Sequence, residues 1–117
     1  MEVSAPRSDP EERTERFARD MRSFIKQLPR TTASIEDGAQ LIRSSGSIGA
    51  NYIEAQEAMS RKDFAMRVKI SRKEAKESRY WLNLLEVPAA LAHEHARLLK
   101  EVGELLKIFS SIVQKVK

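Results

Sequence analysis

Four stretches of the chain repeat apolar residues at alternating spacings of four and three, which is the period of one face of an α-helix. The first stretch opens with Asp9 as a candidate N-cap and Pro10 in the first turn, and Pro29 ends it. Candidate caps at Thr31–Ser34 and at Ser60 open two more stretches. The pattern therefore predicts helices over residues 10–28, about 32–59, 60–85 and about 90–116.

Each predicted helix has an apolar face that would turn toward a shared core. The first carries Phe17, Met21, Phe24 and Leu28, and the second carries Ile35, Ala39, Ile42, Gly49, Tyr52 and Ile53. The third carries Phe64, Val68, Ser71, Ala75, Ser78, Leu82 and Leu85. The fourth carries Leu91, His95, Leu98, Val102, Leu105, Phe109, Ile112 and Val116, widened by Leu99, Leu106 and Val113. Four such helices joined by short loops predict an all-α, antiparallel up-down-up-down four-helix bundle.

Length and composition agree with one small helical domain. The chain has 117 residues, 6% aromatic residues and no cysteine. These values favour helices over sheets and exclude disulfide scaffolds, zinc fingers and cysteine nucleophiles. We expect a disordered tail at 1–8 and a bundle domain at 9–117. Neither a signal peptide nor a long apolar run is present, so we expect a soluble cytoplasmic protein without membrane contact.

The segment Gly46-Ser47-Ile48-Gly49 interrupts the second helix with residues that form helices poorly. It has the spacing of the GxxG loops that grip nucleic-acid backbones, but the surrounding pattern is helical and lacks the strands of such a module. Either the helix bends at this segment, or its small residues let a neighbouring helix approach closely. We favour one long helix, with a kink as the open alternative.

Catalytic groups are sparse. His93 and His95 point to opposite sides of a helix, and His95 is expected to be a packed histidine. Acidic residues gather at Glu54, Glu57, Glu74 and Glu77, with Arg43, Arg67 and Arg79 as candidate partners. Structural ion pairing explains this cluster better than acid–base catalysis, because no second catalytic element accompanies it. We expect no enzyme activity, no cofactor and no metal site.

Positive charge is concentrated in the second half of the chain. Residues 1–60 hold 8 Lys and Arg against 10 Asp and Glu, whereas residues 61–117 hold 13 against 7. A basic ridge about 25 Å long runs along one side of the third helix, and it consists of Lys62, Lys69, Arg72, Lys73, Lys76 and Arg79. It would either follow a phosphate backbone or form an ordinary solvated face. We expect no aromatic residue among the cations of the ridge to stack on bases, so binding should discriminate poorly between base sequences.

A third sector of the same helix contains Ile70 and Trp81, outside both the apolar seam and the basic ridge. A helix of an isolated bundle needs one apolar stripe, so these residues indicate either a subunit interface or a seam wide enough to face two neighbours. The residues alone leave both explanations open.

Residues 41–85 resemble the small bacterial four-helix-bundle family named after the intervening-sequence protein of 23S ribosomal RNA. The resemblance rests on Ile48-Gly49-Ala50-Asn51 with Glu54-Ala55, on Lys62-Asp63-Phe64, on Lys73-Glu74-Ala75 with Glu77, and on Tyr80-Trp81-Leu82. The chain departs from the family in its tight turn at Glu86-Val87-Pro88 and in lacking an aromatic-rich N-terminal opening.

The resemblance implies an antiparallel bundle that assembles as a ring-like homopentamer, with no catalytic activity, cofactor or metal. Family members were noticed in sequences that interrupt large-subunit ribosomal RNA genes, and a related bundle that accompanies a reverse transcriptase is thought to bind nucleic acid. The leading hypothesis is a non-enzymatic oligomer that binds RNA or DNA through the basic ridge. The alternative is a protein-interaction scaffold that binds no nucleic acid.

Overall fold

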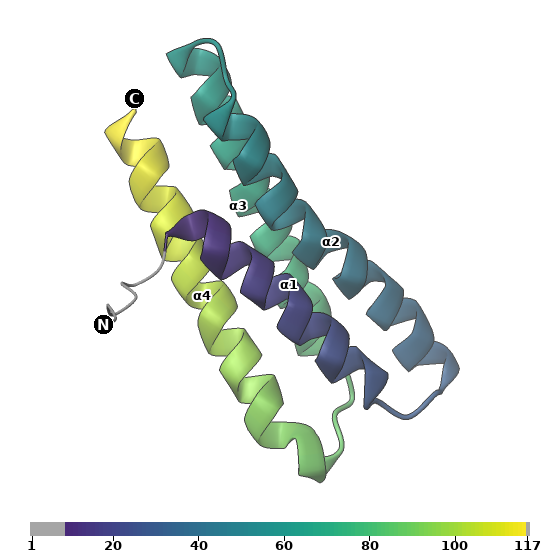
Figure 1. Ribbon diagram of the computed structural model, residues 1–117. Coiled ribbons are helices and arrows are strands. Elements are labelled where there is room, and N and C mark those ends of the chain that lie inside the picture. Colours follow the sequence, from purple (N-terminus) through teal and green to yellow (C-terminus); the bar gives the residue numbers. More distant parts are fainter. Residues whose placement is uncertain (1–8, 117) are drawn as a thin grey trace, which may run out of the picture.

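The computed structural model describes residues 9–116 and shows four long helices (Figure 1). They are α1 (Pro10–Lys26), α2 (Thr32–Gln56), α3 (Arg61–Leu84) and α4 (Ala92–Lys115), with the short 3₁₀ helix η1 (Ala89–Leu91) before α4. The expected all-α class is confirmed, whereas the expected tail at 1–8 lies outside the described residues. In the part of the chain that is described, no helix combines the length and hydropathy needed to cross a membrane.

Side-chain caps fix the first residue of three helices. Each cap oxygen accepts a hydrogen bond from a backbone N–H in the first turn, which would otherwise lack a partner. The pairs are Asp9 with Glu12 at 2.8 Å, Thr31 with Ser34 at 3.1 Å and Ser60 with Asp63 at 3.0 Å. The predicted helix starts at 10 and 32 therefore hold, and the third helix begins at Arg61, one residue after its predicted cap Ser60.

Several boundaries differ from the sequence prediction. α1 ends at Lys26 instead of residue 28, and α3 spans Arg61–Leu84 instead of 60–85. α2 ends at Gln56 instead of near residue 59, because the N–H groups of Glu57 and Ala58 bond back three residues and tighten the last turn. α4 begins at Ala92 instead of near residue 90. Pro88 starts the 3₁₀ turn first, since its carbonyl accepts a 2.9 Å hydrogen bond from the N–H of Leu91.

The helices run alternately up and down, and each packs against its neighbours in the chain (Figure 1). α1 also packs against α4, which closes the bundle. α1 is the shortest of the four and covers only the half of the bundle that contains the α1–α2 connection, so α2, α3 and α4 alone form the other half (Figure 1). In that half Tyr52 of α2 reaches across to Phe109 of α4, with ring centroids 5.9 Å apart.

The core combines the faces predicted for α1, α3 and α4 with Leu41, Ile48 and Ala55 of α2. The largest fully buried side chains belong to α1 and α4, whereas the buried side chains of α3 are smaller. The core residues of these helices are Phe17, Met21, Phe24, Val68, Ala75, Leu82, Leu98, Val102, Leu105 and Phe109. Because α3 packs with this seam inward, the opposite side of α3 faces solvent.

The apolar face predicted for α2 is wrong for its isoleucines, although Tyr52 of that face packs against the core. Ile35, Ile42 and Ile53 are 47%, 37% and 48% exposed, whereas Leu41 and Ile48 are fully buried. The inward face of α2 is therefore rotated away from its isoleucine stripe and combines Leu41 and Ile48 with serines.

Those serines explain why α2 takes this orientation. Ser44 of α2 and Ser78 of α3 are both fully buried, and their hydroxyl oxygens lie 2.8 Å apart. The buried Ser71 of α3 donates a 2.9 Å hydrogen bond to the carbonyl of Ile48. Small side chains let α2 and α3 pack closely, and each buried hydroxyl has a partner, which removes the penalty of burying it.

Candidate nucleic-acid interface

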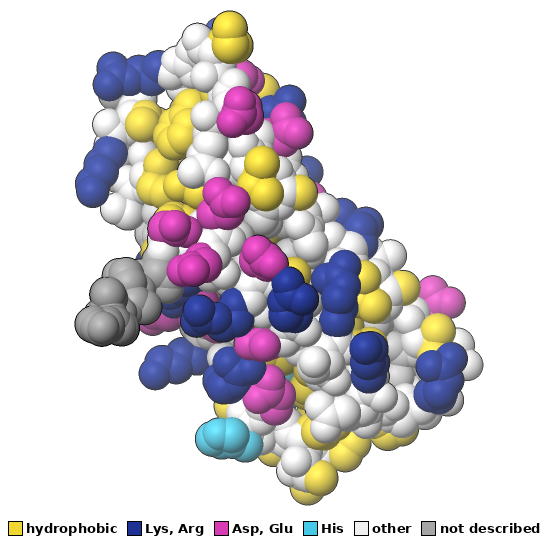
Figure 2. Space-filling view, in the orientation of Figure 1, with side chains coloured by type: hydrophobic (Ala, Val, Ile, Leu, Met, Phe, Trp, Pro, Cys, Tyr) yellow, Lys and Arg dark blue, Asp and Glu magenta, His cyan; other side chains and the backbone are white. Residues whose placement is uncertain are grey.

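Positive and negative side chains are intermingled on the face that contains α1 (Figure 2). Many of them pair between helices. Arg13 of α1 contacts Glu101 of α4 at 2.7 Å, and Arg97 of α4 contacts Asp20 of α1 at 3.0 Å. These ion pairs reduce the net field that this face presents to a charged ligand.

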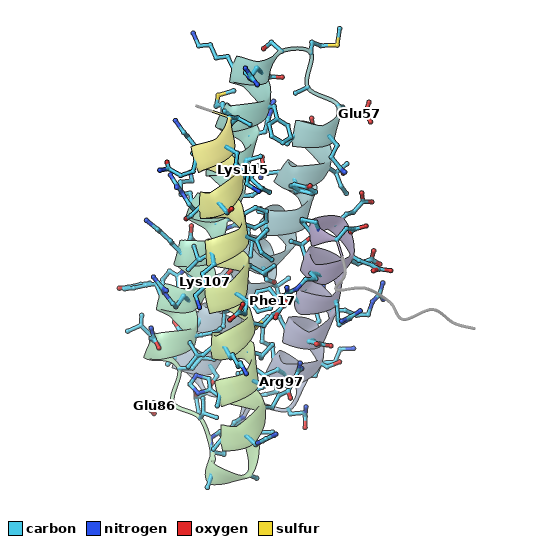
Figure 3. The ribbon with its side chains drawn as sticks, turned by 90° about the vertical axis from the view of Figure 1, so that its left-hand side faces the viewer. Phe17, Glu57, Glu86, Arg97, Lys107 and Lys115 are labelled. Carbon is cyan, nitrogen blue, oxygen red and sulfur yellow. The ribbon has the colours of Figure 1, made fainter. Side chains whose placement is uncertain are left out.

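The basic ridge occupies the solvent side of α3, away from the buried seam of that helix. Lys62, Lys69, Lys73, Lys76 and Arg79 are exposed, and Arg72 is partly exposed. In Figure 3 α3 lies behind α4, and long side chains tipped with nitrogen project on that side of the molecule. The structure thus places all six predicted residues on one accessible helix.

The charges of the basic ridge are not neutralised by the fold. Among residues 9–116, none of its six side chains enters a salt bridge, whereas Arg13, Arg43 and Arg97 on other helices each do. Unpaired cations along one helix create a positive potential that attracts anionic ligands, above all phosphate groups.

Two of the three acidic residues of α3, Glu74 and Glu77, pair with Arg43 of α2. Arg43 of α2 donates hydrogen bonds to Glu74, at 3.3 Å, and to Glu77. The hydrogen bond from Arg43 lowers the pKa of the Glu77 carboxyl, aided by the indole N–H of Trp81 and opposed by burial. The same contact with Glu77 raises the pKa of the Arg43 guanidinium. These carboxylates join α2 to α3, and the charge of Lys73 in the basic ridge also helps to lower the pKa of Glu77.

The expected carboxylate cluster is only partly present. Pairing of Glu74 and Glu77 with Arg43 is confirmed. Of the three candidate partners, Arg43 is the one that pairs, and neither Arg67 nor Arg79 forms a salt bridge within the described residues. Glu54 and Glu57 are exposed near the end of α2, away from the Arg43 contacts. What remains is a structural link between two helices.

Ile70 and Trp81 both lie partly buried on α3. The indole of Trp81 packs against the core, and its Nε1–H donates to Glu77 Oε2 at 3.2 Å. Part of the surface of Trp81 is therefore covered within the bundle, and part is left for another contact. Their role as a subunit interface stays a prediction.

Tyr80 is the residue that the sequence interpretation missed. Its ring is 57% exposed and meets the ring of Trp81 edge-on, with centroids 5.1 Å apart and planes at 75°. It follows Lys76 by four residues and Lys73 by seven, so it lies in the same sector of the helix. The prediction that the basic ridge lacks an aromatic residue is therefore wrong. The helical spacing of Tyr80 from Lys73 and Lys76 would have been enough to place it in the ridge.

An apolar groove of about 820 Å³ borders the N-terminal end of the basic ridge. Its lining includes Ala65 and Met66 of α3 and Val113 near the end of α4. Lys62 and Lys69 stand at its edge. These two cations therefore adjoin an apolar surface as well as solvent.

Two other sequence candidates have structural roles. The Gly46–Gly49 segment lies inside the continuous helix α2, so it forms no loop. His95 stacks on Phe24 at 6.1 Å and its Nε2 lies 2.8 Å from the carbonyl of Leu82, in agreement with a packed histidine. Within residues 9–116, no group of three or more metal-ligating side chains is assembled.

Comparison with known proteins adds a family and a structural relative. Residues 11–111 match the family model described as 23S rRNA-intervening sequence protein. A crystal structure of a protein of unknown function from the S23 ribosomal protein family of Bacteroides thetaiotaomicron is 29% identical. It superposes with a TM-score of 0.76, covering 90% of this chain and 98% of the other. No curated protein matches the chain.

Proposed function

The chain belongs to the 23S rRNA-intervening sequence protein family, and from this premise we propose that it is a non-enzymatic, homo-oligomeric bundle that binds RNA or DNA through the basic ridge. The observation that carries the proposal is the set of unpaired cations on α3. Eight Lys and Arg lie within Arg61–Leu84, against three acidic residues, two of which are held by Arg43.

The chemistry of the basic ridge suits a phosphate backbone. Each Lys or Arg that contacts a phosphate releases condensed counterions, so affinity should fall steeply as salt concentration rises. Lysine and arginine side chains that reach phosphates read no base edges, so the ridge by itself should bind unrelated sequences similarly.

Self-association would multiply these contacts. Support for it comes from the aliphatic stripe of α2, in which Ile35, Ile42 and Ile53 remain 37–48% exposed, and from the partly exposed Ile70 and Trp81 of α3. The family resemblance points to a homopentamer. Several copies of the basic ridge in one assembly would bind a long strand by avidity, with each copy raising the effective concentration of the next.

The alternative function is a protein-interaction scaffold. The apolar groove between α3 and α4 favours it, because a concave apolar surface with charged edges suits a peptide or helix of another protein. In that case the basic ridge would keep the protein soluble and bind no nucleic acid.

Salt-dependent binding separates these two functions. Fluorescence anisotropy on unrelated RNA and DNA oligomers should detect wild-type binding at low salt. We expect the triple variant Lys69→Glu, Lys73→Glu, Lys76→Glu to lose this binding, and each single reversal to flatten the slope of log affinity against log salt by about one unit.

The matched control reverses three exposed cations outside the ridge, with Arg16→Glu, Arg30→Glu and Lys100→Glu. Its net charge changes as much as that of the ridge variant, so retained binding would show that position matters as well as total charge. Circular dichroism and light scattering should show an unchanged fold and mass for both variants. Undetectable wild-type binding at low salt would favour the scaffold.

A further inference from the structure

We propose that Tyr80 provides a base-stacking platform at the end of the basic ridge, so that the ligand of this surface is single-stranded rather than duplex nucleic acid. The inference rests on the proposed function, because the ridge must bind a phosphate backbone for the tyrosine to meet a base. The inference specifies whether the ligand is single-stranded or duplex, which the cations alone do not determine.

Position is the first support. Lys76 lies one helical turn before Tyr80, Lys73 lies two turns before it, and Arg79 is the adjacent residue. All four side chains are exposed. A strand whose phosphates follow the lysines would pass the ring of Tyr80. Proteins that bind single strands without reading their sequence combine such a basic surface with aromatic side chains on which the bases stack.

The ring of Tyr80 is also held in place. Its neighbour Trp81 donates a hydrogen bond to Glu77, which in turn accepts a hydrogen bond from Arg43 of α2. The indole is thereby anchored to two helices, and Tyr80 rests edge-on against it at 5.1 Å. A ring that packs against a fixed neighbour loses less conformational freedom when a base stacks on it than a ring without such a contact.

Exposure leaves room for that base. Tyr80 is 57% exposed, and Leu84, one turn further along α3, is 49% exposed. The two side chains form an apolar surface next to the cations, where a solvated ridge would carry polar residues. An unpaired base has a free aromatic face to place there.

Duplex nucleic acid fits this surface less well. Its bases are already stacked on one another, and a tyrosine on the outside of a straight helix would have to unstack a base pair to reach them. A single strand has no such cost, and its bases splay outward to stack on aromatic side chains. The cations would bind the phosphates of either ligand, so the preference for single strands would come from the tyrosine.

The test compares four ligands by fluorescence anisotropy at one salt concentration. They are a mixed-sequence DNA strand, an RNA strand of the same sequence, the corresponding DNA duplex, and a DNA strand of the same length with abasic sites throughout. Wild type should bind both normal strands more tightly than the duplex and the abasic strand. Tyr80→Ala should weaken binding to the normal strands by about 5- to 100-fold and leave the abasic strand unaffected.

Tyr80→Phe is the matched control, since it keeps the aromatic ring and removes the hydroxyl group. It should retain the preference for single strands. In a separate salt series on the normal DNA strand, the salt slope should be the same in all three proteins, because no phosphate contact changes. Trp81 is the only tryptophan, so its fluorescence should respond to a normal strand in wild type and in Tyr80→Phe, and much less in Tyr80→Ala.

The outcomes separate this inference from the proposed function. If the ridge variant loses binding while Tyr80→Ala binds normal strands as wild type does, the stacking platform is wrong and the nucleic-acid function stands. Equal or tighter wild-type binding to the duplex overturns the platform alone. Absence of any wild-type binding at low salt overturns both.

Discussion

At Gly49 the lack of a side chain lets α2 pack against Thr14 of α1. A Cβ atom added at Gly49 would lie 2.7 Å from Thr14 Oγ1 and 3.1 Å from Thr14 Cβ. Thr14 is itself buried, and its hydroxyl donates a hydrogen bond to the carbonyl of Glu11. The neighbouring Gly46 is different, because a Cβ there would meet only Arg22 at an ordinary 3.7 Å.

The methyl group added in Gly49→Ala should cost about 1–3 kcal/mol in this packed contact. This cost outweighs the gain of about 0.5–1 kcal/mol from replacing a helical glycine, so the protein should lose stability. Gly103→Ala is the matched control, because Gly103 lies in α4 with nothing within 4 Å of an added Cβ. There the same substitution should stabilise by about 0.5–1 kcal/mol, since alanine favours the helix. Urea unfolding measures both changes, and an unaltered or raised stability in Gly49→Ala would contradict the close contact.

At the scale of the helices, the Arg43 link joins α2 to α3 beside the buried serines. Because Arg43 lowers the pKa of Glu77, the ionised carboxyl is favoured in the folded state. The resulting stabilisation is present above the ordinary pKa of 4.5 and is lost as the pH falls through the lowered value.

Glu77→Gln should accordingly lower the free energy of unfolding near neutral pH, by up to about 1 kcal/mol because the pair is partly exposed. The difference from wild type should shrink as the pH falls below the ordinary value of 4.5 and should vanish in strong acid. Urea midpoints across a pH series measure it. Glu57→Gln is the control, since Glu57 is exposed at the end of α2. A difference for Glu77→Gln that stays constant with pH would contradict the assignment.

At the scale of the whole molecule, two exposed apolar surfaces compete as the site of self-association. One is the α3 sector with Ile70 and Trp81, and the other is the α2 stripe with Ile42 and Ile53. Trp81 already packs in part against the core, whereas the isoleucines of α2 remain substantially exposed.

Light scattering on matched variants decides between these surfaces. We expect Ile70→Asp with Trp81→Ala to lower the mass of the assembly while most helical content remains. Ile42→Asp with Ile53→Asp is the parallel variant on α2, and Met59→Asp is the control at a 96% exposed position in the α2–α3 turn. If only the α2 variant dissociates, the α3 sector is not the interface. A wild-type protein that is monomeric at concentrations on the order of tens of micromolar would contradict the oligomer.

The sequence by itself determined the helical class, the caps at Asp9, Thr31 and Ser60, and the inward faces of α1, α3 and α4. Local signals are sufficient there: a cap side chain contacts its own first turn, and a run of large apolar residues at helical spacing has one plausible inward side. The position of the basic ridge on one side of α3 follows from the same periodicity. So does the place of Tyr80 within it, although the sequence interpretation overlooked that residue.

Only the tertiary structure decided which face of α2 is buried. Both its isoleucine stripe and the face with Leu41, Ile48 and Ala55 are apolar, and the second face is buried because its serines allow α3 to approach closely and Ser78 gives Ser44 a hydrogen-bond partner. Contacts with neighbouring helices also determine that Gly49, and not Gly46, lies in the close contact with α1. They likewise determine that Glu74 and Glu77 pair with Arg43. Small and polar residues lack a strong preference for the interior, so their environment is set by the partner that packs against them.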